Sequence, residues 1–144
     1  MDVAARLLSE TARLPARAHD DDAAFDIYAD ESLVLEPGAR ALVATGVAIE
    51  LPPGSAGLVL ARSGLAARQG ISVVNGPGLI DPGYRGEVKV ILLNTDRDEP
   101  FEIAVGDRIA QLLIVQTPAH TIVEATSELQ VSARAGGGFG STGR

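Results

Sequence analysis

The chain has 144 residues, of which 46% are apolar and 22% charged, and its formal net charge is −7. This length suits one domain that buries about two thirds of its surface on folding, so a disordered chain is excluded. A membrane-spanning helix is excluded as well, because the longest apolar candidate, residues 41–61, is interrupted by Glu50 and the Pro52-Pro53-Gly54 sequence.

The charge balance and the missing residue types limit the partners and cofactors. A sequence pI of about 4.7 argues against binding to nucleic acid or to an anionic membrane, where a basic surface supplies most of the affinity. Cysteine is absent and histidine occurs twice, which leaves only a hard cation bound by oxygen as a plausible metal. The N-terminus has no basic start before its short apolar run, so we expect no signal peptide and a cytoplasmic protein.

Clusters of proline, glycine and aspartate divide the chain into short apolar runs, which predicts an all-β sandwich or jelly roll. The strongest strand is residues 86–94, where Val88, Val90 and Leu92 alternate with Glu87, Lys89 and Ile91. In chain order, the expected strands are residues 24–29, 39–51, 57–61, 71–74, 86–94, 101–105, 108–116 and 121–125.

One short helix is expected between the strands at 57–61 and 71–74. Ser63 is predicted to be its N-cap, residues 65–69 favour a helix, and Gly70 suits its C-terminal end. Free backbone N–H groups at a helix start favour an anion, and Arg62 with the Ser63 hydroxyl would strengthen such a site. Plain helix capping is the alternative interpretation.

Residues 75–88 carry Asn75, Asp81 and Tyr84 among several glycines. A hairpin here would offer fixed N–H and C=O groups to a planar ligand, and the glycines would let that ligand come close. An ordinary Asp-Pro-Gly turn, with Tyr84 packed on its neighbours, explains the same residues without a ligand.

The last eleven residues contain five of the sixteen glycines, so we expect a domain over 1–133 followed by a flexible arm over 134–144. Such an arm could fold over a ligand, placing Phe139 against a ring and Arg134 against a phosphate. A disordered terminus is the alternative. The arm lacks the lysine of a Walker phosphate loop and cannot precede a helix.

Five short motifs follow one another over essentially the whole chain. They are AFDIYA at 24–29, RSGLA at 62–66, NGPGLIDPGYRG at 75–86, GDRIAQ at 106–111 and RAGGGFGSTG at 134–143. In this order they resemble the five motifs of the trimeric dUTP diphosphatase (dUTPase) family. The resemblance implies a distorted jelly-roll or β-barrel subunit in a homotrimer, with active sites at subunit boundaries. It also implies Mg²⁺-assisted hydrolysis of dUTP to dUMP and pyrophosphate, which limits uracil in DNA and supplies dUMP for thymidylate synthesis.

The resemblance also assigns roles to the matching residues. Asp81 would be the general base that activates water for attack on the α-phosphorus. Uracil would be recognised by Asn75 and by backbone groups of Leu79, Ile80 and Lys89, and Tyr84 would stack beneath the deoxyribose. The phosphates would be contacted by Arg62, Ser63, Gly64, Gln111 and Arg134. The nucleotide would be covered by Phe139, Gly140 and Ser141. Mg²⁺ would be held by phosphates and waters, with Asp26 orienting one water or serving a structural role.

Three other motif residues, Arg85, Asp107 and Arg108, are expected to form structural pairs.

Two rival functions have to be distinguished from dUTP hydrolysis. A dCTP deaminase has the same fold and a similar turn sequence, but it needs a Glu where this chain has Ile91, and it lacks the glycine-rich arm. A non-catalytic nucleotide-binding module would bind dUTP without turnover. Ammonia release from dCTP, or binding without pyrophosphate release, would identify these rivals.

Overall fold

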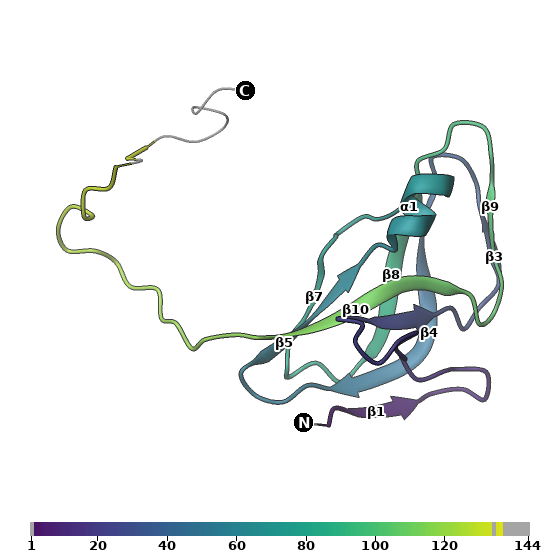
Figure 1. Ribbon diagram of the computed structural model, residues 1–144, viewed down its shortest axis with the longest axis horizontal. Helices are drawn as coiled ribbons and strands as arrows, with labels where there is room; N and C mark the ends of the chain where they lie inside the picture. The colour runs from purple at the N-terminus through teal and green to yellow at the C-terminus, as the bar shows by residue number, and fades with distance from the viewer. Residues whose placement is uncertain (1, 134, 137–144) are drawn as a thin grey trace.

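The computed structural model describes residues 2–133, 135 and 136 and shows a mostly β domain with one short helix (Figure 1). The described elements are β1 (Ala4–Leu7), β2 (Phe25–Tyr28), β3 (Leu33–Leu35), β4 (Arg40–Glu50), β5 (Ser55–Leu60), α1 (Ser63–Gln69), β6 (Ile71–Val73), β7 (Gly78–Ile80), β8 (Glu87–Asn94), β9 (Phe101–Ile103) and β10 (Arg108–Gln116). The expectation of an all-β fold with one helix is confirmed. No helix in this described part is long and apolar enough to cross a membrane.

Within the described residues, the strands form three antiparallel sheets, which do not close into a barrel. Their orders are β1-β4-β8-β6, β2-β10-β5-β7 and β3-β9. The first two sheets contribute to one apolar cluster, in which Val43, Val90 and Leu92 of the first sheet lie with Ile27 and Ile109 of the second. Burial of these side chains is the main driving force for folding and holds the loops described below in place.

Strand β8 shows the alternation that its sequence predicts. Val88 is 5% exposed, Val90 and Leu92 are fully buried, and Lys89 between them is exposed. Successive side chains of a strand point to opposite faces of its sheet, so one face of β8 enters the core while the other faces outward. β8 pairs with β4 on one side and β6 on the other, which fixes it in the middle of its sheet.

Helix α1 ends as predicted but begins differently. Gly70 has a left-handed φ of 64°, and its N–H points back to the carbonyls of Ala66 and Leu65. Ser63 is the first helical residue and not the N-cap, so that prediction is wrong. The N-cap is Arg62, whose backbone is extended and whose side chain makes no capping hydrogen bond, because its guanidinium group is engaged elsewhere.

The expected strand over 121–125 is also wrong. After β10 ends at Gln116, the chain runs away from its own sheets (Figure 1). Ile122 is 99% exposed and Val123 is 77% exposed. A strand needs a neighbour to receive its hydrogen bonds, and this segment has none within its own domain, so its β-branched sequence alone does not make it a strand.

Candidate active site

Three charged residues of separate motifs meet at one end of the second sheet. The buried Asp26 carboxylate of β2 accepts a hydrogen bond from Nε of Arg62 at 3.2 Å and one from Nη1 of Arg108 at 3.3 Å. The Arg62 guanidinium also donates to the Arg108 carbonyl at 3.2 Å. The sheet order explains the meeting, because β10 lies between β2 and β5 and Arg62 follows the end of β5. The expected structural pairing of Arg108 is therefore confirmed.

This charge cluster suits an anion. Two guanidinium groups face a single carboxylate, which leaves several N–H donors without a partner in the cluster. A cavity of about 350 Å³ lies beside Arg62 and Arg108 and is also lined by two acidic residues, Glu102 and Asp107. The Asp107 carboxylate accepts the N–H of Ala104 at 2.8 Å, as expected for a residue that holds its turn together. Phosphate oxygens could therefore reach the arginines from the open side.

Ser63, Gly64 and Gln111 lie around the same cluster. Gln111 is directly opposite Asp26 on β2 and Leu60 on β5. Ser63 and Gly64 form the first turn of α1, and Ser63 is exposed. The three phosphate-binding candidates are thus at the same end of the sheet as Arg62.

A second group of candidates lies in the loop between β7 and β8. The N–H of Tyr84 donates to the carbonyl of Asp81 at 3.0 Å, which closes the expected turn, and the Tyr84 hydroxyl donates to the carbonyl of Glu87 at 2.9 Å. Tyr84 is 45% exposed and Asp81 is exposed. Within the described part of the chain, no hydrogen bond or ion pair engages the Asp81 carboxylate. Its oxygens are therefore available to a water molecule or a ligand.

Asn75 and the residues of β7 lie before this turn. A Cβ on Gly78 would stand 3.2 Å from Nδ2 of Asn75, so the amide side chain lies directly over the backbone at the start of β7. Leu79 is 65% exposed, whereas Ile80 is buried. Lys89 is an exposed residue of β8, and its ammonium group lies 3.3 Å from the Glu87 carboxylate.

Residues 75–88 do not form a hairpin ladder, which corrects the expectation. Strand β7 pairs with β5 in the second sheet, whereas β6 and β8, which flank it in sequence, belong to the first sheet. The segment crosses from one sheet to the other and back because the turns at 74–77 and 82–83, which contain Pro77 and Pro82, redirect the chain. The backbone edges that the hairpin was expected to supply are therefore those of a loop between the sheets.

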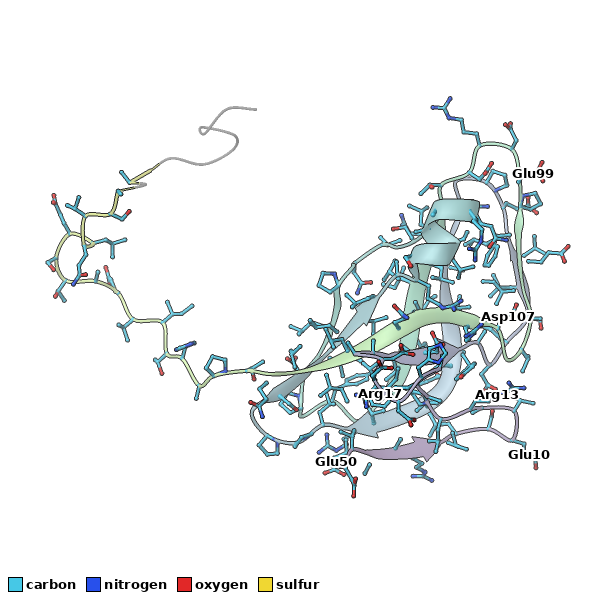
Figure 2. The ribbon with its side chains drawn as sticks, in the orientation of Figure 1. Glu10, Arg13, Arg17, Glu50, Glu99 and Asp107 are labelled. Atoms are coloured by element: carbon cyan, nitrogen blue, oxygen red, sulfur yellow. The ribbon has the colours of Figure 1, made fainter. Side chains whose placement is uncertain are left out.

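The two groups of candidates are separated within one chain. β7 runs antiparallel to β5, with Gly78 opposite Val59 and Ile80 opposite Gly57. Asp81 continues toward the start of β5, whereas Arg62 follows its end. About six residues separate Arg62 from the β5 residue that lies level with Asp81. At about 3.3 Å per residue, the backbones of Asp81 and Arg62 are roughly 20 Å apart. In Figure 2, Glu50, the ion-pair partner of Arg85 in the Asp81 loop, lies well apart from Asp107, which lines the cavity beside the charge cluster.

Two residues of the loop were not singled out from the sequence. Glu87 accepts the backbone N–H of Thr45 at 3.2 Å and of Gly46 at 2.8 Å through its carboxylate. Gly86 lies against the hydroxyl end of the Tyr84 ring. Both belong to the RGE sequence that follows Tyr84, but only the folded contacts show what they touch. Arg134, Phe139, Gly140 and Ser141 lie outside the described residues.

Comparisons with known proteins give a consistent result. The family model described as dUTPase matches residues 10–143. A deoxyuridine 5'-triphosphate nucleotidohydrolase of Mycolicibacterium gilvum is 52% identical over 134 residues, which are 90% of this chain and 87% of that protein. The dUTPase of Staphylococcus bacteriophage 80alpha with dUPNHPP has a TM-score of 0.92 at 31% identity, with 99% of both chains covered.

A further solved structure concerns a metal ion. A mutant dUTPase of phage phi11 of S. aureus has a TM-score of 0.84 and 29% identity, covers 90% of this chain and 100% of its own, and is described as coordinating a structural Mg(II) ion. No group of three or more His, Cys, Asp or Glu side chains that could hold a metal occurs among residues 2–133, 135 and 136 of the present chain.

Proposed function

This chain belongs to the dUTPase family and hydrolyses dUTP, and we propose that Asp81 is the general base of that reaction. The observation that carries the proposal is the exposed Asp81 carboxylate, free of described partners, three residues from the half-exposed ring of Tyr84. A base must have a lone pair available for the proton that it accepts. Asp26 is the other candidate carboxylate of the motifs. It is less suited to be the base than Asp81, because two arginines already bind it.

In the proposed reaction, Asp81 accepts a proton from a water molecule as the water oxygen forms a bond to the α-phosphorus. The bond from that phosphorus to the bridging oxygen of the β-phosphate breaks, and pyrophosphate leaves with the bonding electrons. An in-line arrangement of attacking and leaving oxygens suits phosphoryl transfer. The other product, dUMP, would supply thymidylate synthesis, and removal of dUTP would limit uracil in DNA.

We assign uracil recognition to Asn75 and to backbone groups of Leu79, Ile80 and Lys89. Asn75 lies over the glycine that opens β7, where its amide has both a donor and an acceptor to present. Uracil presents an acceptor, a donor and an acceptor, whereas cytosine has an amino donor in place of the O4 acceptor. A rigid complementary site would leave unpaired groups with cytosine, which is a strong basis for discrimination. Tyr84 would support the deoxyribose.

The phosphates are assigned to the charge cluster, with Arg62, Ser63, Gly64 and Gln111 as their ligands. Mg²⁺ fits this cluster only indirectly, because each Asp26 oxygen already accepts from an arginine. The remaining lone pairs of that carboxylate suit a metal-bound water, and Mg²⁺ retains its waters readily. Bound to the triphosphate, the ion would neutralise charge that develops during the reaction. Asp26 would hold one of its waters, and Arg62 and Arg108 would hold the Asp26 carboxylate in place.

A homotrimer is proposed because one chain leaves the site in two parts. Asp81 and Arg62 lie at opposite ends of β5, so a single dUTP is best served by Asp81 of one copy and Arg62 of another. Residues 117–133 run away from the domain with Ile122, Val123, Leu129 and Val131 at least 77% exposed. Apolar side chains at such exposure favour contact with another copy. The arm would then close over the nucleotide with Arg134, Phe139, Gly140 and Ser141, in a cytoplasmic enzyme that acts where deoxynucleotides are used.

The direct test is product analysis with the purified full chain. We expect pyrophosphate and dUMP from dUTP with Mg²⁺, loss of turnover on chelation, and little product from UTP or dCTP. Ammonia from dCTP would instead indicate a deaminase. Binding of dUTP without pyrophosphate release would indicate a non-catalytic module and would overturn the proposal.

A further inference from the structure

The ring of Tyr84 lies directly against the backbone of Gly86. A Cβ built on Gly86 would stand 2.6 Å from Cζ and 3.0 Å from Cε2 of the tyrosine, and nearer still to its hydroxyl oxygen. Side-chain carbons in close-packed proteins do not approach ring atoms this closely. Only glycine at position 86 therefore lets the ring occupy its present place.

The backbone does not itself require glycine at this position. Gly86 lacks the left-handed φ that distinguishes Gly38, Gly46, Gly54, Gly70 and Gly106. A left-handed backbone is therefore not the reason for glycine here. The contact with Tyr84 thus remains as the reason for glycine. Gly83, in the same loop, also lacks a left-handed φ and has nothing within 4 Å of its virtual Cβ.

A second contact fixes the same hydroxyl end of the tyrosine. The hydroxyl donates to the carbonyl of Glu87 at 2.9 Å. The Glu87 carboxylate in turn accepts from the backbone N–H groups of Thr45 and Gly46 in β4 and pairs with Lys89. The tyrosine is therefore tied to the start of β8, which β4 holds in place. Gly86 covers part of the Tyr84 side chain, which is 45% exposed, so a ligand can contact only the exposed part.

We propose that Gly86 is a positioning residue. The absence of a side chain at this position lets the Tyr84 ring lie close to the backbone, and this sets the depth of the site for the deoxyribose. The proposal rests on the function above, in which Tyr84 supports the deoxyribose. A methyl group at position 86 would push the ring toward its exposed side, where the sugar binds. Binding would suffer more than chemistry, because Asp81 and the phosphate ligands are untouched.

The kinetic test compares Gly86→Ala with Gly83→Ala, its matched control. For Gly86→Ala we expect the KM for dUTP to rise by about tenfold with kcat within about threefold, since a small misplacement of a positioning group has large effects. Gly83→Ala should behave as the unmodified chain. Tyr84→Ala removes the whole ring, so in that background Gly86→Ala should raise KM by much less than it does in the unmodified chain. Equal KM values for Gly86→Ala and Gly83→Ala, or an equal effect of Gly86→Ala with and without the ring, would overturn the proposal.

A spectroscopic readout does not depend on turnover. The chain has two tyrosines and no tryptophan, so Tyr28→Phe leaves Tyr84 as the sole source of tyrosine signal. In that background, Gly86→Ala should change the near-ultraviolet circular dichroism, whereas Gly83→Ala should not. If the unmodified chain fails to hydrolyse dUTP, the proposed function fails while this spectrum still reports the ring position. If Gly86→Ala does not fold, Tyr84→Ala, which removes the ring, should restore folding, and failure of that rescue would contradict the contact with the ring.

Discussion

Asp26 and Asp81 are both motif carboxylates, but their surroundings give them different chemistry. Asp26 is buried between two guanidinium groups, so its charge is neutralised and its orientation fixed. Asp81 is exposed, and it has no described partner that would compete for its lone pairs. A paired carboxylate positions other groups, whereas an unpaired one can exchange a proton with water. The assignment of the base therefore depends on environment as well as on motif position.

Replacing Asp81 by asparagine tests that assignment. Asp81→Asn keeps the size and one oxygen of the side chain but cannot accept the proton, so we expect kcat to fall by about 10² or more. Affinity for a non-hydrolysable dUTP analogue should stay within about tenfold, because the contacts with base and phosphate remain. Steady-state kinetics and calorimetry measure the two effects separately. Turnover close to that of the unmodified chain would remove Asp81 from the role of base.

Single residues could be proposed for the site where a side chain acts through its own chemistry. Asp81, Tyr84 and Arg62 were named from the motifs that resemble those of the dUTPase family, and their roles stay predictions. Gly86 and Glu87 could not be named in this way. What matters at these positions is a missing Cβ and a backbone carbonyl, and neither has meaning until the fold brings Tyr84 against them.

At the scale of elements, local sequence patterns predicted strands reliably where the neighbouring strands come from the same chain. The alternation of β8 was predictable because β4 and β6 flank it and the core covers one face. Residues 75–88 and 121–125 were not, because strand pairing depends on distant partners. The short strands β1, β3 and β7 were missed, although β2, β6 and β9, which are equally short, lie within predicted strands.

The loop between β8 and β9 gives a prediction that depends on pH. Backbone N–H groups of Asp98 and Glu99, and then that of Arg97, hold the pKa of Asp96 below its ordinary value, although partial desolvation opposes them. A lowered pKa in the folded state stabilises the fold above the unfolded pKa of about 3.9, and this stability is lost as pH falls through the folded pKa. Asp96→Ala should therefore lower Tm at pH 6, with a difference that shrinks at lower pH.

Thermal unfolding of the two proteins between pH 6 and pH 2.5 would measure this dependence. Asp98→Ala is a suitable control, because the hydrogen bond within the loop comes from the backbone of Asp98 and not from its side chain. It should cause a smaller loss of Tm with little dependence on pH. A Tm difference for Asp96→Ala that stays constant over the whole range would contradict the role of the Asp96 charge.

At the scale of the whole molecule, the domain over 1–133 and the arm over 134–144 are expected to have separate roles. The domain would provide folding and assembly, and the arm would support turnover. The core and all described strands lie before residue 117. Deleting residues 134–144 should therefore leave Tm and oligomeric mass nearly unchanged, while turnover falls by about 10² or more as cover for the nucleotide is lost. Scanning calorimetry, light scattering and pyrophosphate release measure the three properties. Normal turnover in the shortened chain would show that the arm is not a lid.

The proposed sharing of sites between copies allows a stronger test. Light scattering should give about three times the 14.9 kDa mass of one chain. Arg62→Ala and Asp81→Asn should each be nearly inactive alone, because every site then lacks a phosphate ligand or the base. When the two variants are unfolded together and refolded as mixed trimers, a site can take Asp81 from one variant and Arg62 from the other.

Random mixing of equal amounts makes about one site in four complete, since each of its two chains is the required variant in half of the cases. We therefore expect recovery of up to about a quarter of normal activity after refolding together, and none when the two variants are refolded separately and then combined. A chain that carries both substitutions, refolded with Asp81→Asn, is the matched control and should stay inactive, because neither chain supplies Asp81. Absence of recovery in trimers shown to be mixed would mean that both residues of a site come from the same chain, contrary to the roughly 20 Å separation along β5.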